Sequence, residues 1–142
     1  MGNFWILLFR SLFLTVYFKV LPFITLFQKK CFFINKVCKI LQKNPEGFTL
    51  NIETFKPVKK GIAVAYQETQ DSFGKDGLEN TINHALNNNK VLGGWFNVDN
   101  KKYYFDSVRI FKNLKKSIKF GIKNNQIAIF NITTLEEITI GG

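Results

Sequence analysis

Hydrophobic and polar positions follow regular patterns from residue 47 onward. Residues 47–55 (GFTLNIETF) alternate apolar and polar side chains, which predicts a half-buried strand. The run 59–70 (KKGIAVAYQETQ) contains a near-continuous apolar stretch, Ile62 to Tyr66, which is typical of a strand at the centre of a sheet. The pattern therefore predicts two strands before any helix.

A helix is predicted next. Asp76 and Glu79 have the spacing of a capping box, in which two side chains satisfy the first free N–H groups of a helix. Four apolar residues fall at helical spacing behind it: Leu78, Ile82, Ala85 and Leu86. The polar run 87–89 suits the end of this helix.

The remainder of the chain predicts a hairpin, a second helix and two more strands. Runs 90–98 and 102–111 are rich in β-forming residues and flank Asp99-Asn100-Lys101, which has good turn chemistry. Residues 113–123 predict a helix whose buried side is Leu114, Ser117, Ile118, Gly121 and Ile122. Residues 126–132 predict an apolar strand, and residues 133–140 a short edge strand.

In chain order, residues 61–132 give βαββαβ, the order of the ferredoxin-like split βαβ unit, in which both helices cover one face of an antiparallel sheet. The strand over residues 47–55 would add at an edge. The predicted fold is therefore an α+β two-layer sandwich, ferredoxin-like with an added N-terminal edge strand, over residues 44–142.

Residues 1–43 have a different composition and predict a hydrophobic, basic helical leader. Residues 4–27 are long enough to span a bilayer, but Arg10 and Lys19 interrupt the apolar run at a high energetic cost. Polar residues recur at helical spacing and form one narrow stripe: Ser11, Thr15, Lys19, Pro22, Thr25 and Lys29. Two interpretations are open: an amphipathic membrane anchor over residues 4–41, or a spurious extension of the reading frame.

The formal charge of +10 is unevenly distributed. Residues 1–43 contain seven basic side chains and no acidic one, so residues 44–142 carry a net charge of only +3. The global charge therefore describes the leader rather than the predicted domain. The two cysteines, Cys31 and Cys38, also lie in the leader, and their spacing indicates neither a metal site nor a disulfide. Nothing requires an oxidising compartment, and we expect a cytoplasmic protein that associates with membranes if the leader is real.

The aromatic run 93–111 (GGWFNVDNKKYYFDSVRIF) must place rings on both faces of its hairpin. Alternation puts Tyr104 and Asp106 on one face with Val108 and Ile110, and the residues between them on the other. Because two helices cover only one face, the other is either covered by another layer or forms an interaction surface. We expect most of these rings to be core, with Trp95, Tyr103 and Arg109 as the best surface candidates.

Catalytic chemistry has weak support. The end of the second strand leads into a loop where sites are often built, and its candidate residues are Glu68, Asp71 and Ser72, with Asp106 from the hairpin. No pair has the spacing of a known catalytic motif, and no cofactor or metal is expected. His84, the only histidine, is expected to be solvated at the surface. A small enzyme with a site near residues 68–74 is the third of three functional hypotheses.

Nucleic-acid binding has better support. The second helix carries a basic face that could contact phosphates: Lys112, Lys115, Lys116, Lys119 and Lys123. The competing interpretation is an ordinary solvated face, and KYYFDSVRIF lacks the signature of RNA-recognition domains.

The segments GGW, YYFDS, FG and QIAIF, with TQDSFGKDGLE, give the chain a resemblance over residues 45–140. It resembles small uncharacterised proteins encoded by phages and other mobile elements of gut bacteria. The resemblance implies an accessory factor that binds macromolecules rather than a catalyst. The first functional hypothesis is therefore a non-catalytic binding or accessory protein, with a protein partner, a second copy or nucleic acid as its target.

Overall fold

The computed structural model describes residues 28–141. The chain divides into two compact units, Met1–Lys36 and Val37–Gly142. Residues 28–43 are helical, so one helix crosses the division between the units. No helix among residues 28–141 is long and apolar enough to cross a membrane. The apolar stretch over residues 4–27, on which the anchor hypothesis depends, lies outside the described residues.

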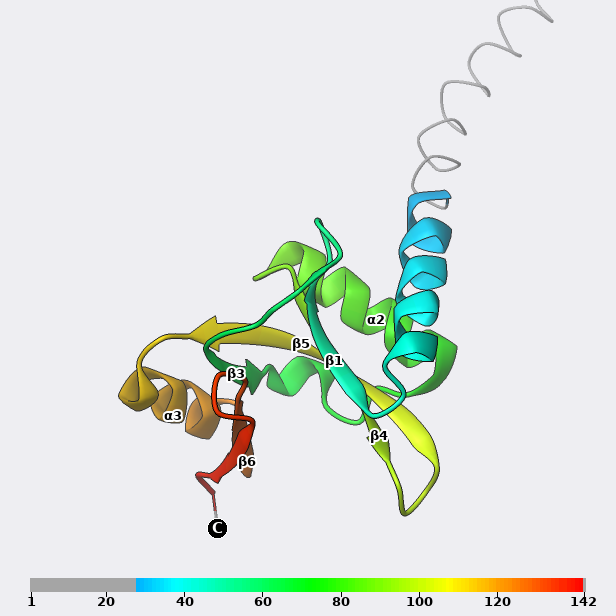
Figure 1. Ribbon diagram of the computed structural model, residues 1–142. Coiled ribbons are helices and arrows are strands. Elements are labelled where there is room, and N and C mark those ends of the chain that lie inside the picture. Colours follow the sequence, from blue (N-terminus) through cyan, green and yellow to red (C-terminus); the bar gives the residue numbers. More distant parts are fainter. Residues whose placement is uncertain (1–27, 142) are drawn as a thin grey trace, which may run out of the picture. The chain divides into compact units, whose positions relative to one another are not determined.

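The second unit is an α+β structure, which confirms the predicted fold class at this level (Figure 1). Its described strands form one antiparallel sheet in the order β2-β1-β4-β5-β3-β6-β7. The strands are β1 (Gly47–Asn51), β2 (Lys56–Pro57), β3 (Ile62–Ala65), β4 (Val91–Asn97), β5 (Lys102–Phe111), β6 (Ala128–Asn131) and β7 (Glu136–Thr139). The helices are η1 (Gln67–Thr69, a 3-10 turn), α2 (Gly74–Asn87) and α3 (Leu114–Lys123).

Both α2 and α3 pack on the same face of the sheet. α2 lies against β4 and β5, where the Thr81 hydroxyl donates to the Phe105 carbonyl at 3.3 Å. α3 lies against β3 and β6, over a core of Ile62, Val64 and Ile129. The Tyr66 ring, two residues beyond Val64 and so on the same face, contacts both His84 of α2 and Phe120 of α3, with ring centroids 5.0 and 5.2 Å apart.

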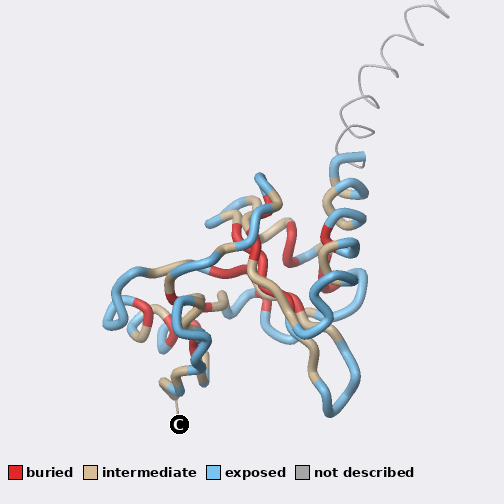
Figure 2. Tube along the Cα trace, in the orientation of Figure 1, coloured by how far each residue is buried: buried red, intermediate tan, exposed pale blue. Residues whose placement is uncertain are grey.

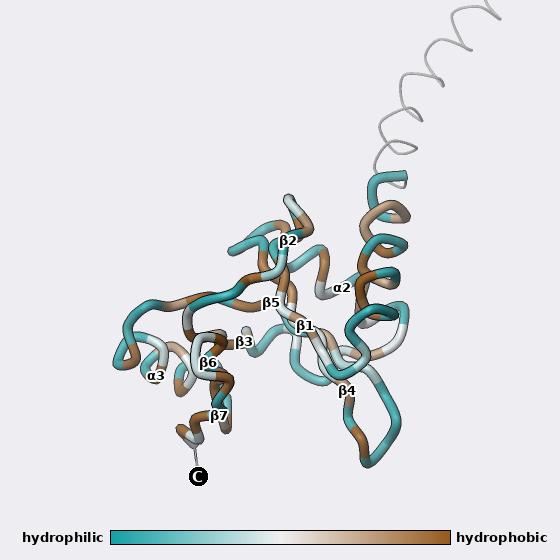
Figure 3. Tube along the Cα trace, viewed as in Figure 1, coloured by the Kyte–Doolittle hydropathy of each residue, from teal (hydrophilic) through white to brown (hydrophobic). Residues whose placement is uncertain are grey.

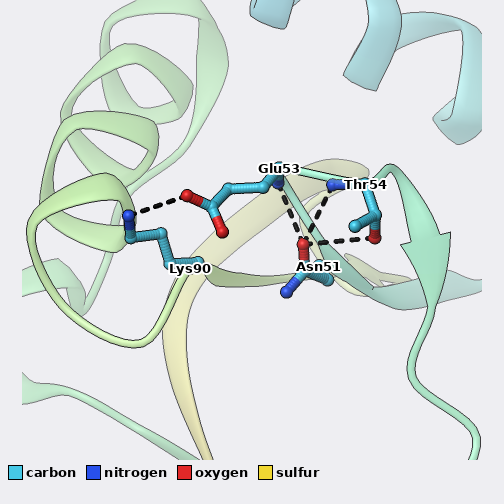
Figure 4. A network of polar contacts seen from close by, with 4 residues as sticks. All are labelled: Asn51, Glu53, Thr54 and Lys90. Carbon is cyan, nitrogen blue, oxygen red and sulfur yellow. Dashed lines mark hydrogen bonds and ion pairs between the residues drawn. The ribbon is translucent and has the colours of Figure 1, made fainter.

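The first predicted strand is shorter than expected. β1 ends at Asn51, and a turn follows before the two-residue strand β2. The Asn51 carboxamide oxygen accepts hydrogen bonds from the Glu53 and Thr54 N–H groups, at 3.0 Å each, and from the Thr54 hydroxyl (Figure 4). Lys90 pairs with Glu53 at 2.8 Å beside this turn. The alternation predicted a longer strand because Ile52, although in the turn, is fully buried.

The predicted capping box of the first helix is wrong. α2 begins two residues before Asp76, with Phe73 as N-cap, and the Phe73 carbonyl accepts from the Gly77 N–H at 3.2 Å. Gly77 allows this early start, since a Cβ there would lie 2.7 Å from the backbone carbon of Ser72. Three of the four predicted core residues of this helix, Leu78, Ile82 and Ala85, are buried, whereas Leu86 is only partly buried. The helix ends at Asn87 as expected.

The predicted buried stripe of α3 is also partly wrong. Leu114 and Ile122 are 46% and 58% exposed, whereas Ser117 and Gly121 are buried. Small residues face the core because the helix lies close to the sheet: a Cβ on Gly121 would meet the Ile140 side chain at 2.3 Å. The start of the helix was predicted correctly, and the Asn113 side chain caps it by accepting from the Lys116 N–H at 3.0 Å.

Buried residues are concentrated in the middle of the sheet, whereas the hairpin turn is exposed (Figure 2). On the face opposite the helices the same difference is found. Val91 and Val108 pair across β4 and β5 on this face and are 7% and 5% exposed. Toward the hairpin turn the same face opens, and Trp95 is 45% exposed. Apolar positions are concentrated in the middle of the sheet, whereas the hairpin turn is largely hydrophilic (Figure 3). This face is therefore covered at one end and accessible at the other.

Candidate functional site

The β4–β5 hairpin sends its aromatic side chains to both faces, as the alternation predicted. Trp95 pairs with Tyr104, and Phe96 with Tyr103. The Trp95 pair shares its face with Asp106, whereas the Tyr103 pair shares the face of Phe105 and the helices. The three predicted surface residues therefore do not form one surface, since Tyr103 and Arg109 face the helix side and Trp95 faces away.

Three rings gather at the accessible end of the face opposite the helices, and we call Phe73, Trp95 and Tyr104 the hairpin aromatic cluster. The Trp95 and Tyr104 rings stack with centroids 5.0 Å apart and an interplanar angle of 19°. Phe73 meets Tyr104 edge-on at 5.7 Å and is itself 45% exposed. The Lys102 ammonium lies 4.1 Å from the centroid of the Phe73 ring, a close cation–π contact.

Asp106 adds a carboxylate to this cluster. The Trp95 indole N–H donates to its Oδ2 at 3.2 Å and is the one hydrogen-bond donor to this carboxylate among the described residues. Burial raises the pKa of Asp106 to about 6, the indole hydrogen bond opposes that rise, and the charge of Asp71 adds to it. The neutral indole N–H of Trp95 thus compensates for only part of the desolvation cost of the Asp106 carboxylate.

The segment 66–73 reaches the cluster because it continues along the edge of β5 beyond the end of β3. The Tyr66 N–H donates to the Ser107 carbonyl at 2.9 Å, and the Phe105 N–H donates to the Ser72 carbonyl at 2.8 Å. Phe73 then forms a single β-bridge with Tyr104. These contacts bring Phe73 and Asp71 to Trp95 and Asp106 from more than twenty residues away.

The candidate residues of the predicted functional loop lie in two different surroundings. Asp71 lies in a left-handed conformation with φ 57°, and its charge acts on Asp106, so the structure brings these two together. Ser72 contributes its carbonyl to the backbone pairing. Glu68, on η1, instead acts electrostatically on Tyr66.

A second aromatic group lies on the helix side of the sheet. The centroid of the Tyr66 ring lies 5.0 Å from that of His84 and 5.2 Å from that of Phe120, and the Tyr66 hydroxyl donates to the Asn89 side chain. Burial raises the pKa of Tyr66, the nearby Arg109 guanidinium lowers it, and Glu68 raises it. His84, expected to be solvated at the surface, is half-buried and packs edge-on against Tyr66.

The other two predicted surface residues make contacts on this side. Tyr103 packs on Phe96 at 4.9 Å, and its hydroxyl donates to the Pro45 carbonyl, so it holds the start of β1 to the hairpin. The exposed Arg109 guanidinium lies over the Phe111 and Phe120 rings at 5.2 and 5.4 Å.

The predicted basic face of α3 points to solvent. Four lysines of α3 and one that precedes the helix are exposed, as is Ile122: Lys115, Lys116, Lys119, Lys123 and Lys112. Within residues 28–141, no three His, Cys, Asp or Glu side chains form a group that could hold a metal ion. Cys31 and Cys38 are free and exposed.

Sequence reasoning missed Phe73 and Lys102 and counted Tyr104 only as hairpin core. The alternation already placed Tyr104 beside Asp106 on one face, and that signal could have identified half of the cluster. No protein-family model matches the chain, and comparisons with curated proteins and with solved structures gave no match. The site is therefore interpreted from its own geometry.

Proposed function

We propose that this chain is a non-catalytic binding protein that engages a macromolecular partner through the hairpin aromatic cluster. The observation that supports this most strongly is the pair of accessible rings, Trp95 and Phe73, each 45% exposed, around the stacked Tyr104. Contiguous exposed apolar surface rimmed by polar groups is typical of interaction sites. Tryptophan and tyrosine are also the side chains that most often dominate binding energy. An accessory role, as the mobile-element resemblance implies, is compatible with such a surface.

We further propose that residues 62–131 are a ferredoxin-like unit. The strand order β4-β5-β3-β6, with α2 and α3 on one face, supports this topology. The sheet face opposite the helices carries Trp95, and its accessible end, toward the hairpin turn, could bind a partner.

The test is capture of a partner by the full chain and by two variants. Trp95→Ala should reduce the recovered partner at least tenfold, because it removes the largest exposed ring of the cluster. Leu135→Gln is the matched control, since Leu135 is 75% exposed and lies in the turn between β6 and β7. A partner that both variants recover equally well would place the binding surface elsewhere.

Nucleic-acid binding through α3 is the second candidate, supported by the solvent-exposed positions of its four lysines and of Lys112 just before it. Phosphate contacts predict affinity that falls steeply with salt. Fluorescence anisotropy with single- and double-stranded oligonucleotides at two salt concentrations measures this for the full chain. Lys115→Glu with Lys119→Glu should abolish salt-dependent binding, whereas reversal of the exposed Lys59 and Lys60 should reduce it far less. Equal losses in both variants would indicate a response to net charge alone.

A further inference from the structure

The hairpin aromatic cluster combines ring faces with the Asp106 carboxylate, which forms no ion pair within residues 28–141. Trp95 uses one ring face to stack on Tyr104, while 45% of the residue remains exposed. The Asp106 carboxylate lies at the edge of that same indole, 3.2 Å from its nitrogen. A group stacked on the free face of Trp95 would therefore lie next to a carboxylate oxygen.

We infer that this cluster binds a basic side chain, best an arginine, presented by a protein partner. A guanidinium is planar, so it can stack on an indole and donate to an adjacent carboxylate at the same time. This inference rests on the proposed function, because it names the chemistry of the group that the cluster recognises.

The chain itself shows that the cluster accepts a cation. The Lys102 ammonium already lies over the Phe73 ring at 4.1 Å, at one end of the cluster. Trp95, at the other end, offers the aromatic face on which cations bind most strongly. The rings of this surface are thus arranged for cation–π contacts, and one of them is occupied by the protein's own side chain.

Electrostatics favour a cation over a nucleotide at this position. The charge of Asp71, from the segment 66–73, acts on Asp106, while Tyr104 and Lys102 share the face of β5 that carries Asp106, with the Lys102 ammonium over the Phe73 ring. Asp71 and Asp106 repel each other, and an arriving guanidinium would relieve that repulsion and the cost of burying the carboxylate. A nucleotide could stack on Trp95, but it would bring a phosphate toward two carboxylates.

Binding of a cation should also be linked to ionisation of Asp106. The guanidinium interacts with the carboxylate form, so affinity is expected to rise between pH 5 and pH 7 as the proton leaves Asp106. A purely stacking ligand would show no such dependence.

The test follows the indole N–H signal of Trp95 by NMR in the full chain carrying Trp5→Phe, which leaves Trp95 as its only tryptophan. The probes are the N-acetyl amides of arginine and lysine, the neutral isostere citrulline, and adenosine monophosphate. Arginine should shift the signal saturably, with at least fivefold weaker binding by citrulline and with lysine intermediate. Equal binding by citrulline, tighter binding by the nucleotide, or no response to any probe would each overturn the inference.

Two variants test whether the Asp106 carboxylate contributes to arginine binding. Asp106→Asn should weaken arginine binding at least fivefold and remove its pH dependence, while the amide oxygen still accepts from Trp95. Asp99→Asn is the matched control, because Asp99 is an exposed carboxylate in the hairpin turn. The affinity of this variant for the arginine probe should equal that of the parent chain. If Asp106→Asn binds arginine like the parent chain while Trp95→Ala still loses the captured partner, the cation inference fails and the proposed function stands.

Discussion

The backbone N–H of Ser107 donates a hydrogen bond to the Thr69 hydroxyl oxygen at 2.9 Å, linking residues 38 positions apart. Both residues are buried, at 0% and 2% exposure. This bond joins the segment 66–73 to β5 midway between the contacts of Tyr66 and Ser72. It therefore holds in place the segment that carries Asp71 and Phe73 to the cluster.

Thr69→Val is expected to destabilise the protein by about 1–3 kcal/mol, because it leaves a buried N–H without an acceptor. Valine keeps the shape of threonine, so the loss reports the two hydrogen bonds of the Thr69 hydroxyl, from the Ser107 N–H and to the Tyr66 carbonyl, and not packing. Urea denaturation measures the change. The control is Ser107→Ala: the Ser107 Oγ has no hydrogen-bond partner among the described residues, so its removal should be near neutral. Equal losses in the two variants would contradict the assigned role of the Thr69 oxygen.

The raised pKa of Asp106 predicts a pH-dependent stability difference. Its folded pKa of about 6 lies above the ordinary 3.8, so the folded state holds the proton more tightly. The free energy of unfolding should therefore fall as the pH rises from about 4 to 6 and level off above that, by up to about 3 kcal/mol at 1.36 kcal/mol per pKa unit.

Asp106→Asn removes this titration. Subtracting its stability from that of the parent chain at each pH cancels the contributions of other carboxylates. The difference should change between pH 4 and pH 6, and a flat difference would show that the carboxylate is not perturbed. In the Trp5→Phe background, Trp95 fluorescence should titrate with a midpoint near pH 6.

Gly121→Ala should destabilise the protein by about 1–2 kcal/mol despite the better helix propensity of alanine. The added methyl would lie 2.3 Å from the Ile140 Cδ1 atom and 3.1 Å from the Ile129 side chain. Ile140→Val removes the closest atom, so the double variant should lose less stability than the sum of the single variants. Thermal unfolding of the four proteins measures the coupling; strict additivity would mean that the two residues do not meet.

Ile122→Gln should change stability by less than about 0.5 kcal/mol, because Ile122 is 58% exposed on the solvent side of α3. Ile129→Ala should cost about 2–4 kcal/mol, since Ile129 is 3% exposed and packs in the core with Val64. Denaturation midpoints of the two variants compare these positions directly. A large loss of stability for Ile122→Gln would mean that Ile122 is packed in the core, as the sequence pattern predicted.

Local patterns predicted the elements and hairpin faces well because they depend on neighbours in sequence. Alternation assigned Tyr104 and Asp106 to one face, and Asn113 marked the start of α3. The pattern placed Gly121 and Ile122 together on the buried side, but it could not predict that α3 approaches the sheet so closely that only the small Gly121 is buried. That choice depends on Ile140, which is distant in sequence.

The candidate site was harder to predict for the same reason. Asp106 and Trp95 were identified separately, but their hydrogen bond depends on strand register. Phe73 joins them only because the segment 66–73 pairs with β5. The strand predicted over residues 59–70 stops short of Phe73, and no periodic pattern indicates that the pairing continues to it.

The pairing of the segment 66–73 with β5 makes the cluster a property of the folded chain. Phe73 reaches the hairpin residues Trp95 and Asp106 only while that segment stays in place, so a ligand of the whole cluster binds the native state and not the unfolded one. Ligand binding then raises the free energy of unfolding, by about 2.7 kcal/mol when the free ligand is at 100 times its dissociation constant. Slower proteolysis between Glu68 and Gly74 would report an occupied site, even for a ligand whose identity is unknown.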